Sequence, residues 1–136
     1  MSGPLDGIRI VDLSVAITGP LAAGMLVDQG ADCVKVEQAP TGDVARWLGS
    51  TVAGISAMFQ AANRGKRSIV LDLGQADGLA ILRDLVADAD VLVQNFRPGV
   101  AERLGVAYDD IRSIRPDIVY ADLTGFGPSG PYSHRR

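Results

Sequence analysis

Apolar residues gather in five short runs along the chain, each four to six residues long and separated by more polar segments. The runs are Arg9–Leu13, Cys33–Glu37, Ser68–Leu73, Val91–Gln94 and Ile118–Leu123. Most are continuous in hydrophobicity rather than alternating, which is typical of strands that are covered on both faces. The pattern therefore predicts five buried β-strands.

The segments between these runs carry helical spacing. We expect helices over Pro20–Gln29, Gln75–Ala89, Tyr108–Ile114 and, after a loop through Gly42, around Ile55–Ala62. Proline suits the first turn of a helix, and a glycine follows the first of these segments as a stop signal. Strands that alternate with helices form a parallel sheet with right-handed crossovers. The fold class predicted is therefore α/β, with a parallel sheet flanked by helices.

Length and charge narrow the class of protein. The chain has 136 residues, 47% of them hydrophobic, and a net charge of −3. This length fits one domain, residues 1–136. The charge does not suit a general nucleic-acid binder, no apolar run is long enough to span a bilayer, and the N-terminus lacks the apolar core of a signal peptide. We expect a cytoplasmic protein that binds neither nucleic acid nor membranes.

Two residue types that often carry chemistry occur only once. Cys33 lies within an apolar run, so we expect a buried and inert thiol, and a single cysteine excludes an internal disulfide. His134 stands two residues from the end of the sequence without a partner acid nearby. A loop residue is the favoured interpretation for His134, rather than a general base.

The first strand–turn–helix unit, Val11–Glu37, is similar to the opening of a dinucleotide-binding domain. Its glycine fingerprint is incomplete, because only Gly19, Pro20 and Gly24 stand where G-x-G-x-x-G is expected. This departure disfavours a dehydrogenase. Acids also lie at three strand ends, at Asp12, Glu37 and Asp72. They would suit a metal ion or cap the following turns, and because no histidine accompanies them we expect no metal.

The segment NFRPG, Asn95–Gly99, follows a strand and precedes a helix. Free backbone amides at such a junction stabilise an anion, Arg97 adds a charged donor, and Phe96 offers a flat face to an adenine ring. In the alternative interpretation Asn95 caps, Phe96 packs in the core, and Pro98 and Gly99 form a turn. The spacing leaves both open.

A second cluster, NRGKRS at residues 63–68, contains the cations Arg64, Lys66 and Arg67. A solvated face is the favoured interpretation. Together with Arg97 and Arg103, the cluster would instead line a groove for a phosphorylated ligand. Trp47 and Met58 are expected in the core or at a domain contact.

Several motifs occur in an order that resembles one family. They are PLDGIRIVDLS, GADCVKVEQAPTGD, NRGKRSIVLDL, ADVLVQNFRPGVAERLGV and PDIVYADLTGFGPSGPY. Together they resemble the N-terminal portion of the class III CoA-transferases, a group that includes formyl-CoA and carnitine-CoA transferases and the α-methylacyl-CoA racemases. The resemblance covers almost the whole chain.

The resemblance implies a Rossmann-like large domain that binds coenzyme A (CoA), a smaller second domain, and a homodimer of interlocked chains. It also implies that CoA moves between an acyl-CoA and a small carboxylic acid through a covalent aspartyl intermediate, without a metal. A racemase of the same lineage and a non-catalytic nucleotide-binding fragment are the alternatives. The last residues form no further element, so we expect an incomplete part of a longer fold.

The resemblance also assigns a CoA site to ten positions. They are Val15, Ala16, Ile17 and Thr18 after the first strand, Gln38, Leu71, and Asn95, Phe96, Arg97 and Arg103. No aspartate in this sequence matches the family's nucleophile, which is expected beyond Arg136. The resemblance therefore implies that the 136-residue chain alone is inactive.

Overall fold

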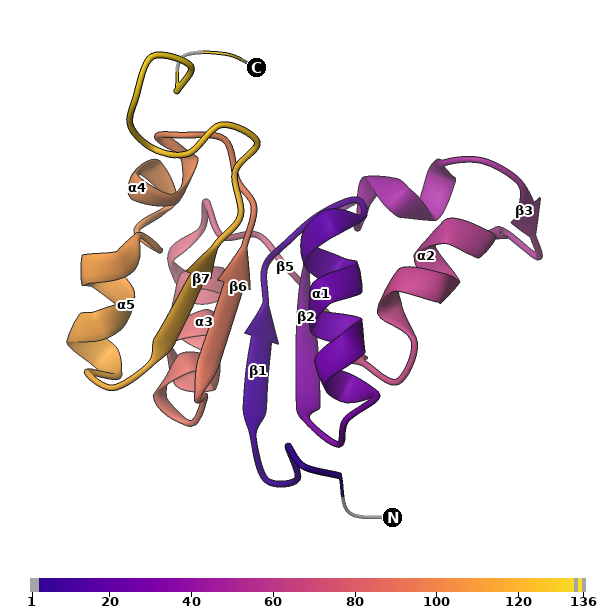
Figure 1. Ribbon diagram of the computed structural model, residues 1–136, viewed down its shortest axis with the longest axis horizontal. Helices are drawn as coiled ribbons and strands as arrows, with labels where there is room; N and C mark the ends of the chain where they lie inside the picture. The colour runs from indigo at the N-terminus through magenta and orange to yellow at the C-terminus, as the bar shows by residue number, and fades with distance from the viewer. Residues whose placement is uncertain (1–2, 134, 136) are drawn as a thin grey trace.

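The computed structural model describes residues 3–133 and 135 and contains a five-stranded sheet (Figure 1). The strands are β1 (Arg9–Asp12), β2 (Asp32–Gln38), β5 (Arg67–Leu71), β6 (Val91–Gln94) and β7 (Val119–Asp122). All four strand pairs are parallel, and Ile10 of β1 lies opposite Cys33 on one side and Val91 on the other. The predicted parallel sheet is confirmed, and the strand bounds differ by at most two residues.

The order of the strands across the sheet is β5-β2-β1-β6-β7. The chain thus moves outward from β1 to β5, returns to the other side of β1, and continues outward through β6 and β7. This is the order of the first five strands in doubly wound nucleotide-binding folds. The direction of winding reverses between β1 and β6, and ligands of such sheets bind outside the carboxyl ends of the strands at this switch point.

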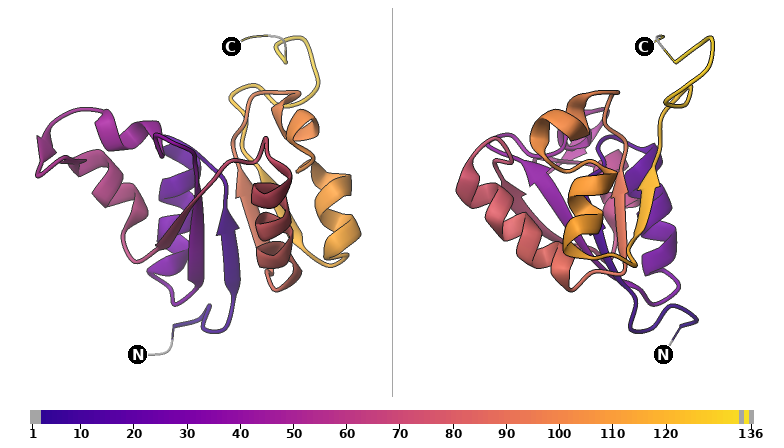
Figure 2. Two further views of the ribbon diagram at one scale, coloured as in Figure 1. Left: turned by 180° about the vertical axis from the view of Figure 1, so that it is seen from behind. Right: turned by 90° about the vertical axis from the view of Figure 1, so that its left-hand side faces the viewer.

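Helices cover both faces of the sheet (Figure 2). The helices α1 (Thr18–Val27) and α2 (Ala57–Asn63) pack together on one side, and α3 (Ala76–Ala87) and α5 (Tyr108–Ile114) on the other. Successive strand residues point to opposite faces, so Ile10 joins the core under α1 while Val11 joins the core under α3. Two covered faces are the physical reason for the continuous apolar runs.

The segment between β2 and β5 differs from its prediction. It contains a 3₁₀ turn, η1 (Val44–Trp47), a short hairpin of β3 (Thr51–Val52) and β4 (Ile55–Ser56), and then α2. The helix begins at Ala57, because the Ser56 hydroxyl accepts a hydrogen bond from the Phe59 amide at 3.1 Å.

Trp47 and Met58 lie in this segment and are 64% and 36% exposed. Their predicted core position is therefore wrong in this chain. The segment extends sideways beyond α1 and β2 (Figure 1). A domain contact for these two residues stays a prediction.

Cys33 is 1% exposed within the core under α1. Burial, assisted by the nearby Asp12 carboxylate, raises the pKa of its thiol to about 12, as expected for an inert cysteine. The prediction for His134 falls outside the described residues. Within residues 3–133 and 135, no helix combines the length and apolarity that crossing a bilayer requires.

Candidate functional site

Several cavities open at the carboxyl edge of the sheet, and two of them contain most of the predicted site residues. The first, of about 420 Å³, lies near the ends of β2 and β5 and is called here the β5-side cavity. Its walls are mainly apolar, and its polar side chains include Gln38 and Asp72 from the strand ends and Arg103 from α4 (Val100–Leu104). An apolar cavity with a few polar groups is the usual form of a small-molecule site.

The second cavity, of about 630 Å³, lies between the loop after β6 and the segment after β7 and is called the β7-side cavity. Asn95 and Arg97 line it from one side, Thr124 and Phe126 from another. Phe96 lines both cavities and also packs against the main core. The two cavities therefore adjoin at one aromatic ring.

The structure brings eight of the ten predicted site residues to these cavities. Val15, Gln38, Leu71 and Arg103 line the β5-side cavity, Thr18, Asn95 and Arg97 line the β7-side cavity, and Phe96 lines both. Ala16 and Ile17 line neither. The arginines Arg97 and Arg103, expected in one groove, lie in separate cavities.

Asn95 fixes the loop that follows β1. Its side-chain amide donates to the Val15 carbonyl at 2.9 Å and accepts from the Val15 amide at 2.8 Å. Asn95 therefore bridges two loops rather than capping its own. Phe96 packs against the core, as in the packing interpretation of NFRPG, and also lines both cavities; the ligand interpretation stays a prediction.

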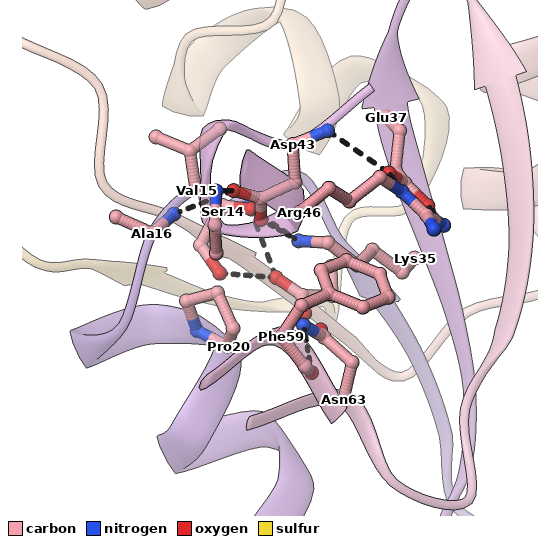
Figure 3. Close-up of polar contacts among 12 residues, drawn as sticks. Ser14, Val15, Ala16, Pro20, Lys35, Glu37, Asp43, Arg46, Phe59 and Asn63 are labelled. Carbon is pink, nitrogen blue, oxygen red and sulfur yellow. Dashed lines mark hydrogen bonds and ion pairs between the residues drawn. The ribbon is translucent and has the colours of Figure 1, made fainter. Parts of the chain in front are cut away.

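The loop after β1 contains a residue in an unusual conformation. Ala16 has φ = 65°, in the left-handed region, which costs an alanine about 1–2 kcal/mol. Its amide donates to Asp43 Oδ1 at 3.0 Å. The Lys35 ammonium donates to the Ser14 carbonyl at 2.7 Å and lies 2.8 Å from Asp43 Oδ2 (Figure 3).

Behind this loop, the strand-end acid Asp12 forms an ion pair. Asp12 lies 2.7 Å from the Lys66 ammonium, which also donates to the Pro20 carbonyl at 2.6 Å and to Asn63 Oδ1 at 3.0 Å. The Lys66 side chain is only 1% exposed. A buried charge needs such partners, because an unpaired ion in the interior is strongly destabilising.

This geometry corrects the prediction for the second cationic cluster. Arg64 pairs with Asp28, and Arg67 with Asp32 at 2.6 Å, both on the surface. The solvated-face interpretation holds for these two arginines but not for Lys66. None of the three lines either of the two cavities, so the groove that they were to share with Arg97 and Arg103 does not form.

Glu37 is held by four donors. Arg46 binds both of its carboxylate oxygens at 2.6 and 2.7 Å, the Ser68 hydroxyl donates at 2.5 Å, and the Asp43 amide at 2.9 Å. Burial by itself raises the pKa of Glu37, but these hydrogen bonds outweigh it and lower the pKa to about 2. The Arg46 guanidinium also lies 3.9 Å from the centre of the Phe59 ring.

The third strand-end acid, Asp72, accepts from the Gly74 amide at 2.9 Å in a turn. Each of the acids considered for a metal is thus engaged by protein donors. In the part of the chain that the structure describes, no group of three or more His, Cys, Asp and Glu side chains is placed to hold a metal ion.

The sequence interpretation missed Lys35 and Asp43, although one signal for them exists. Lys35 interrupts an apolar run that was predicted to be buried on both faces. A lysine at such a position needs an anionic partner. The pattern gives no indication of which acid that partner is.

The strand order defines a doubly wound α/β fold, and the two cavities lie at the edge where proteins of this fold commonly bind their ligands. The chain belongs to CoA-transferase family III, whose family model matches residues 5–136. The resemblance drawn from the motifs is therefore confirmed.

Two curated relatives illustrate the family. The chain is 43% identical to an acetyl-CoA:oxalate CoA-transferase of Acetobacter aceti, over 97% of this chain and 34% of that protein. It is 41% identical to a succinate–glutarate CoA-transferase of Agrobacterium fabrum, over 96% of this chain and 34% of the relative. The chain thus spans about a third of the length of these relatives.

A solved structure shares the fold. A CAIB/BAIF family protein from Brucella suis superposes with a TM-score of 0.93 at 41% identity, over 99% of this chain and 37% of that one. Its matching part supports the arrangement of strands and loops described above.

Proposed function

We propose that this chain forms the CoA-binding part of a CoA-transferase that moves CoA between an acyl-CoA thioester and a carboxylic acid. The observation that carries the proposal is the pair of adjoining cavities at the switch point, each with an arginine in its wall and both lined by Phe96. Family membership supports the same ligand.

The chemistry of the cavities suits CoA. The apolar wall of the β5-side cavity and the Phe96 ring match an adenine, which stacks on aromatic and aliphatic surfaces. Arg97 and Arg103 offer charge-assisted hydrogen bonds to phosphate groups. Gln38 and Asp72 offer acceptors for ribose hydroxyls. A nucleotide in one cavity would leave the other for a different part of the same long ligand.

In the proposed reaction an aspartate carboxylate attacks the thioester carbonyl. The C–S bond breaks, CoA leaves as a thiolate, and an acyl–aspartyl anhydride remains. The thiolate then attacks the aspartyl carbonyl, which forms an enzyme thioester and releases the donor acid. The acceptor carboxylate attacks this thioester, the C–S bond breaks, and a second anhydride forms. The thiolate finally attacks the acceptor carbonyl, which gives the new acyl-CoA and frees the aspartate carboxylate. Because no aspartate here matches the family's motif, we place this nucleophile in a part of the longer protein outside these 136 residues.

Two relatives are named for their acids, oxalate in one and glutarate in the other. They support a small carboxylic acid as the acceptor. Both are transferases, which favours transfer over racemisation. We also propose that the longer protein forms a homodimer, in which the exposed apolar side chains of Trp47, Val52 and Ile55 gain cover.

Calorimetric titration of the chain with CoA and with NAD tests the binding proposal. We expect CoA to bind and NAD to show no heat. The substitution Arg103→Met should weaken CoA binding about tenfold, the loss of one charged hydrogen bond. Arg112→Met is the matched control, because Arg112 is exposed on α5, stacks on Tyr108 and lines neither cavity. Absence of CoA binding, or equal affinity in both variants, contradicts the proposal.

A further inference from the structure

The loop after β1 touches both cavities. Val15 lines the β5-side cavity and Thr18, at the start of α1, lines the β7-side cavity. Ala16 lies between them and lines neither, yet it holds the left-handed φ of 65° that reverses the chain at this point. A change of conformation at Ala16 would therefore move the walls of both cavities.

A non-glycine residue keeps such a conformation only where its surroundings over-determine it. Side chains from β2, from the segment after β2 and from the loop after β6 hold this loop. Asp43, which follows β2, accepts the Ala16 amide at 3.0 Å, Lys35 of β2 binds the Ser14 carbonyl, and Asn95 binds both backbone groups of Val15. Four consecutive bonds to the backbone thus cover Ser14 to Ala16.

The Asp43 carboxylate is itself fixed in place. Its Oδ1 also accepts from the Ala45 amide at 2.8 Å, and its Oδ2 lies 2.8 Å from the Lys35 ammonium. Both side chains are at most 1% exposed. An acceptor with an ionised oxygen and no competing water binds an amide more strongly than a neutral, exposed one.

We propose that Asp43 is a positioning residue for the loop after β1. Its carboxylate, with its charge balanced by Lys35, accepts the Ala16 amide and holds Ala16 in the left-handed conformation. In this way Asp43 fixes the walls of both cavities before the ligand binds. The ligand assignment rests on the proposed function. The positioning does not, because it concerns the free protein.

The decisive pair of variants is Lys35→Met/Asp43→Leu and Lys35→Met/Asp43→Asn. Both remove the buried ion pair, which hydrophobic residues of similar volume often replace without loss of stability. Leucine and asparagine are close in shape, but only asparagine keeps an oxygen that accepts the Ala16 amide. The leucine variant removes the acceptor of both the Ala16 and the Ala45 amides, so we expect CoA binding weaker by about tenfold or more there and a smaller change in the asparagine variant.

A readout without ligand accompanies the titration. In NMR spectra a strong cross-peak between the amide and Hα protons of Ala16 marks positive φ. We expect this signal, and slow exchange of the Ala16 amide, in the wild type and the asparagine variant but not in the leucine variant. Adding Ala16→Gly to the leucine variant should recover part of the affinity, because glycine adopts positive φ without strain.

Ala16→Val tests the same point with all charges in place, since a β-branched residue resists positive φ; we expect about tenfold weaker binding. The proposal is overturned if the leucine variant keeps wild-type affinity and the Ala16 signal, if both double variants lose affinity equally, or if Ala16→Val binds normally. Failure of the wild type to bind CoA contradicts the proposed function alone, and the Ala16 signal still decides the positioning role.

Discussion

The side-chain amide of Asn95 and the backbone of Val15 form two hydrogen bonds, one in each direction, at 2.9 and 2.8 Å. The two residues follow β6 and β1, the neighbouring strands at which the winding of the sheet reverses. These two bonds extend the hydrogen bonding between β1 and β6 beyond the strand ends, with a side chain in place of one backbone. The Asn95 amide thus joins the two loops that border the proposed ligand site.

Replacing Asn95 with leucine should therefore affect stability and ligand binding together. Two backbone groups of Val15 lose their partners, which costs about 1–3 kcal/mol for each group that stays buried. We expect a lower midpoint in urea unfolding and weaker CoA binding. Gln29→Ala is the control, since Gln29 donates one similar bond to the Met25 carbonyl on the exposed side of α1. A normal midpoint for Asn95→Leu would contradict the bridging role.

The ion pair of Glu37 predicts how stability depends on pH. The pKa of Glu37 is about 2 in the folded chain, below its ordinary value of 4.5. Its stabilising contribution is therefore complete above about pH 4.5 and disappears as the pH falls towards 2, because the unfolded chain binds the proton first. The shift corresponds to roughly 3 kcal/mol.

Urea unfolding between pH 7 and pH 2.5 measures this contribution. We expect Glu37→Gln to be less stable at pH 7 and to lose less stability on acidification than the wild type. Glu102→Gln changes an exposed acid and should follow the wild-type curve. Parallel curves for Glu37→Gln and the wild type would show that the ion pair contributes nothing.

The buried pair of Lys66 and Asp12 predicts a non-additive result. Lys66→Met leaves the Asp12 carboxylate buried without its cation, which costs about 3–5 kcal/mol. The double variant Asp12→Asn/Lys66→Met removes both charges and should recover most of this loss. Thermal unfolding of the two variants and of Asp12→Asn provides the cycle. Additive effects would mean that the two side chains do not interact.

The close packing around Gly19, in α1, predicts that a larger side chain at this position destabilises the protein. A Cβ atom at this position would overlap the Ser14 side chain, which is buried and bonded to Asp12. Gly19→Ala should lower the free energy of unfolding by about 1–3 kcal/mol, as for an overpacked core site. Gly125→Ala is the matched variant, because open space surrounds its added methyl. A thermal midpoint for Gly19→Ala equal to that of Gly125→Ala would contradict this close packing.

Local hydrophobic patterns were sufficient to predict most of the sheet. Apolar runs placed all five strands within two residues of their observed bounds, and the alternation of strands and helices predicted their parallel order. The segment after β2 was harder to predict, because its hairpin strands have two residues each and therefore show no hydrophobic periodicity. Its exposed Trp47 also contradicts the usual burial of tryptophan.

The candidate site was predictable in outline only. Motifs indicated the strand ends and the NFRPG loop, and eight of ten residues named from them line the two cavities. Arg97 and Arg103 line separate cavities that share Phe96 in their walls, which no motif indicates. Lys66 looked like part of a solvated cluster, because the sequence does not show that it reaches Asp12, 54 residues away.

The sequence by itself determined most of the helices, the five strands of the parallel sheet and the family, because each depends on residue spacing or on motifs that can be read within a short stretch of chain. Tertiary structure decided the partners of the charged and polar side chains. Asn95 meets Val15 across 80 residues, and Asp43 meets Ala16 across 27. Such pairs form only after the sheet has brought β1, β2 and β6 side by side. A buried polar group then needs a partner from a neighbouring segment, because water cannot reach it.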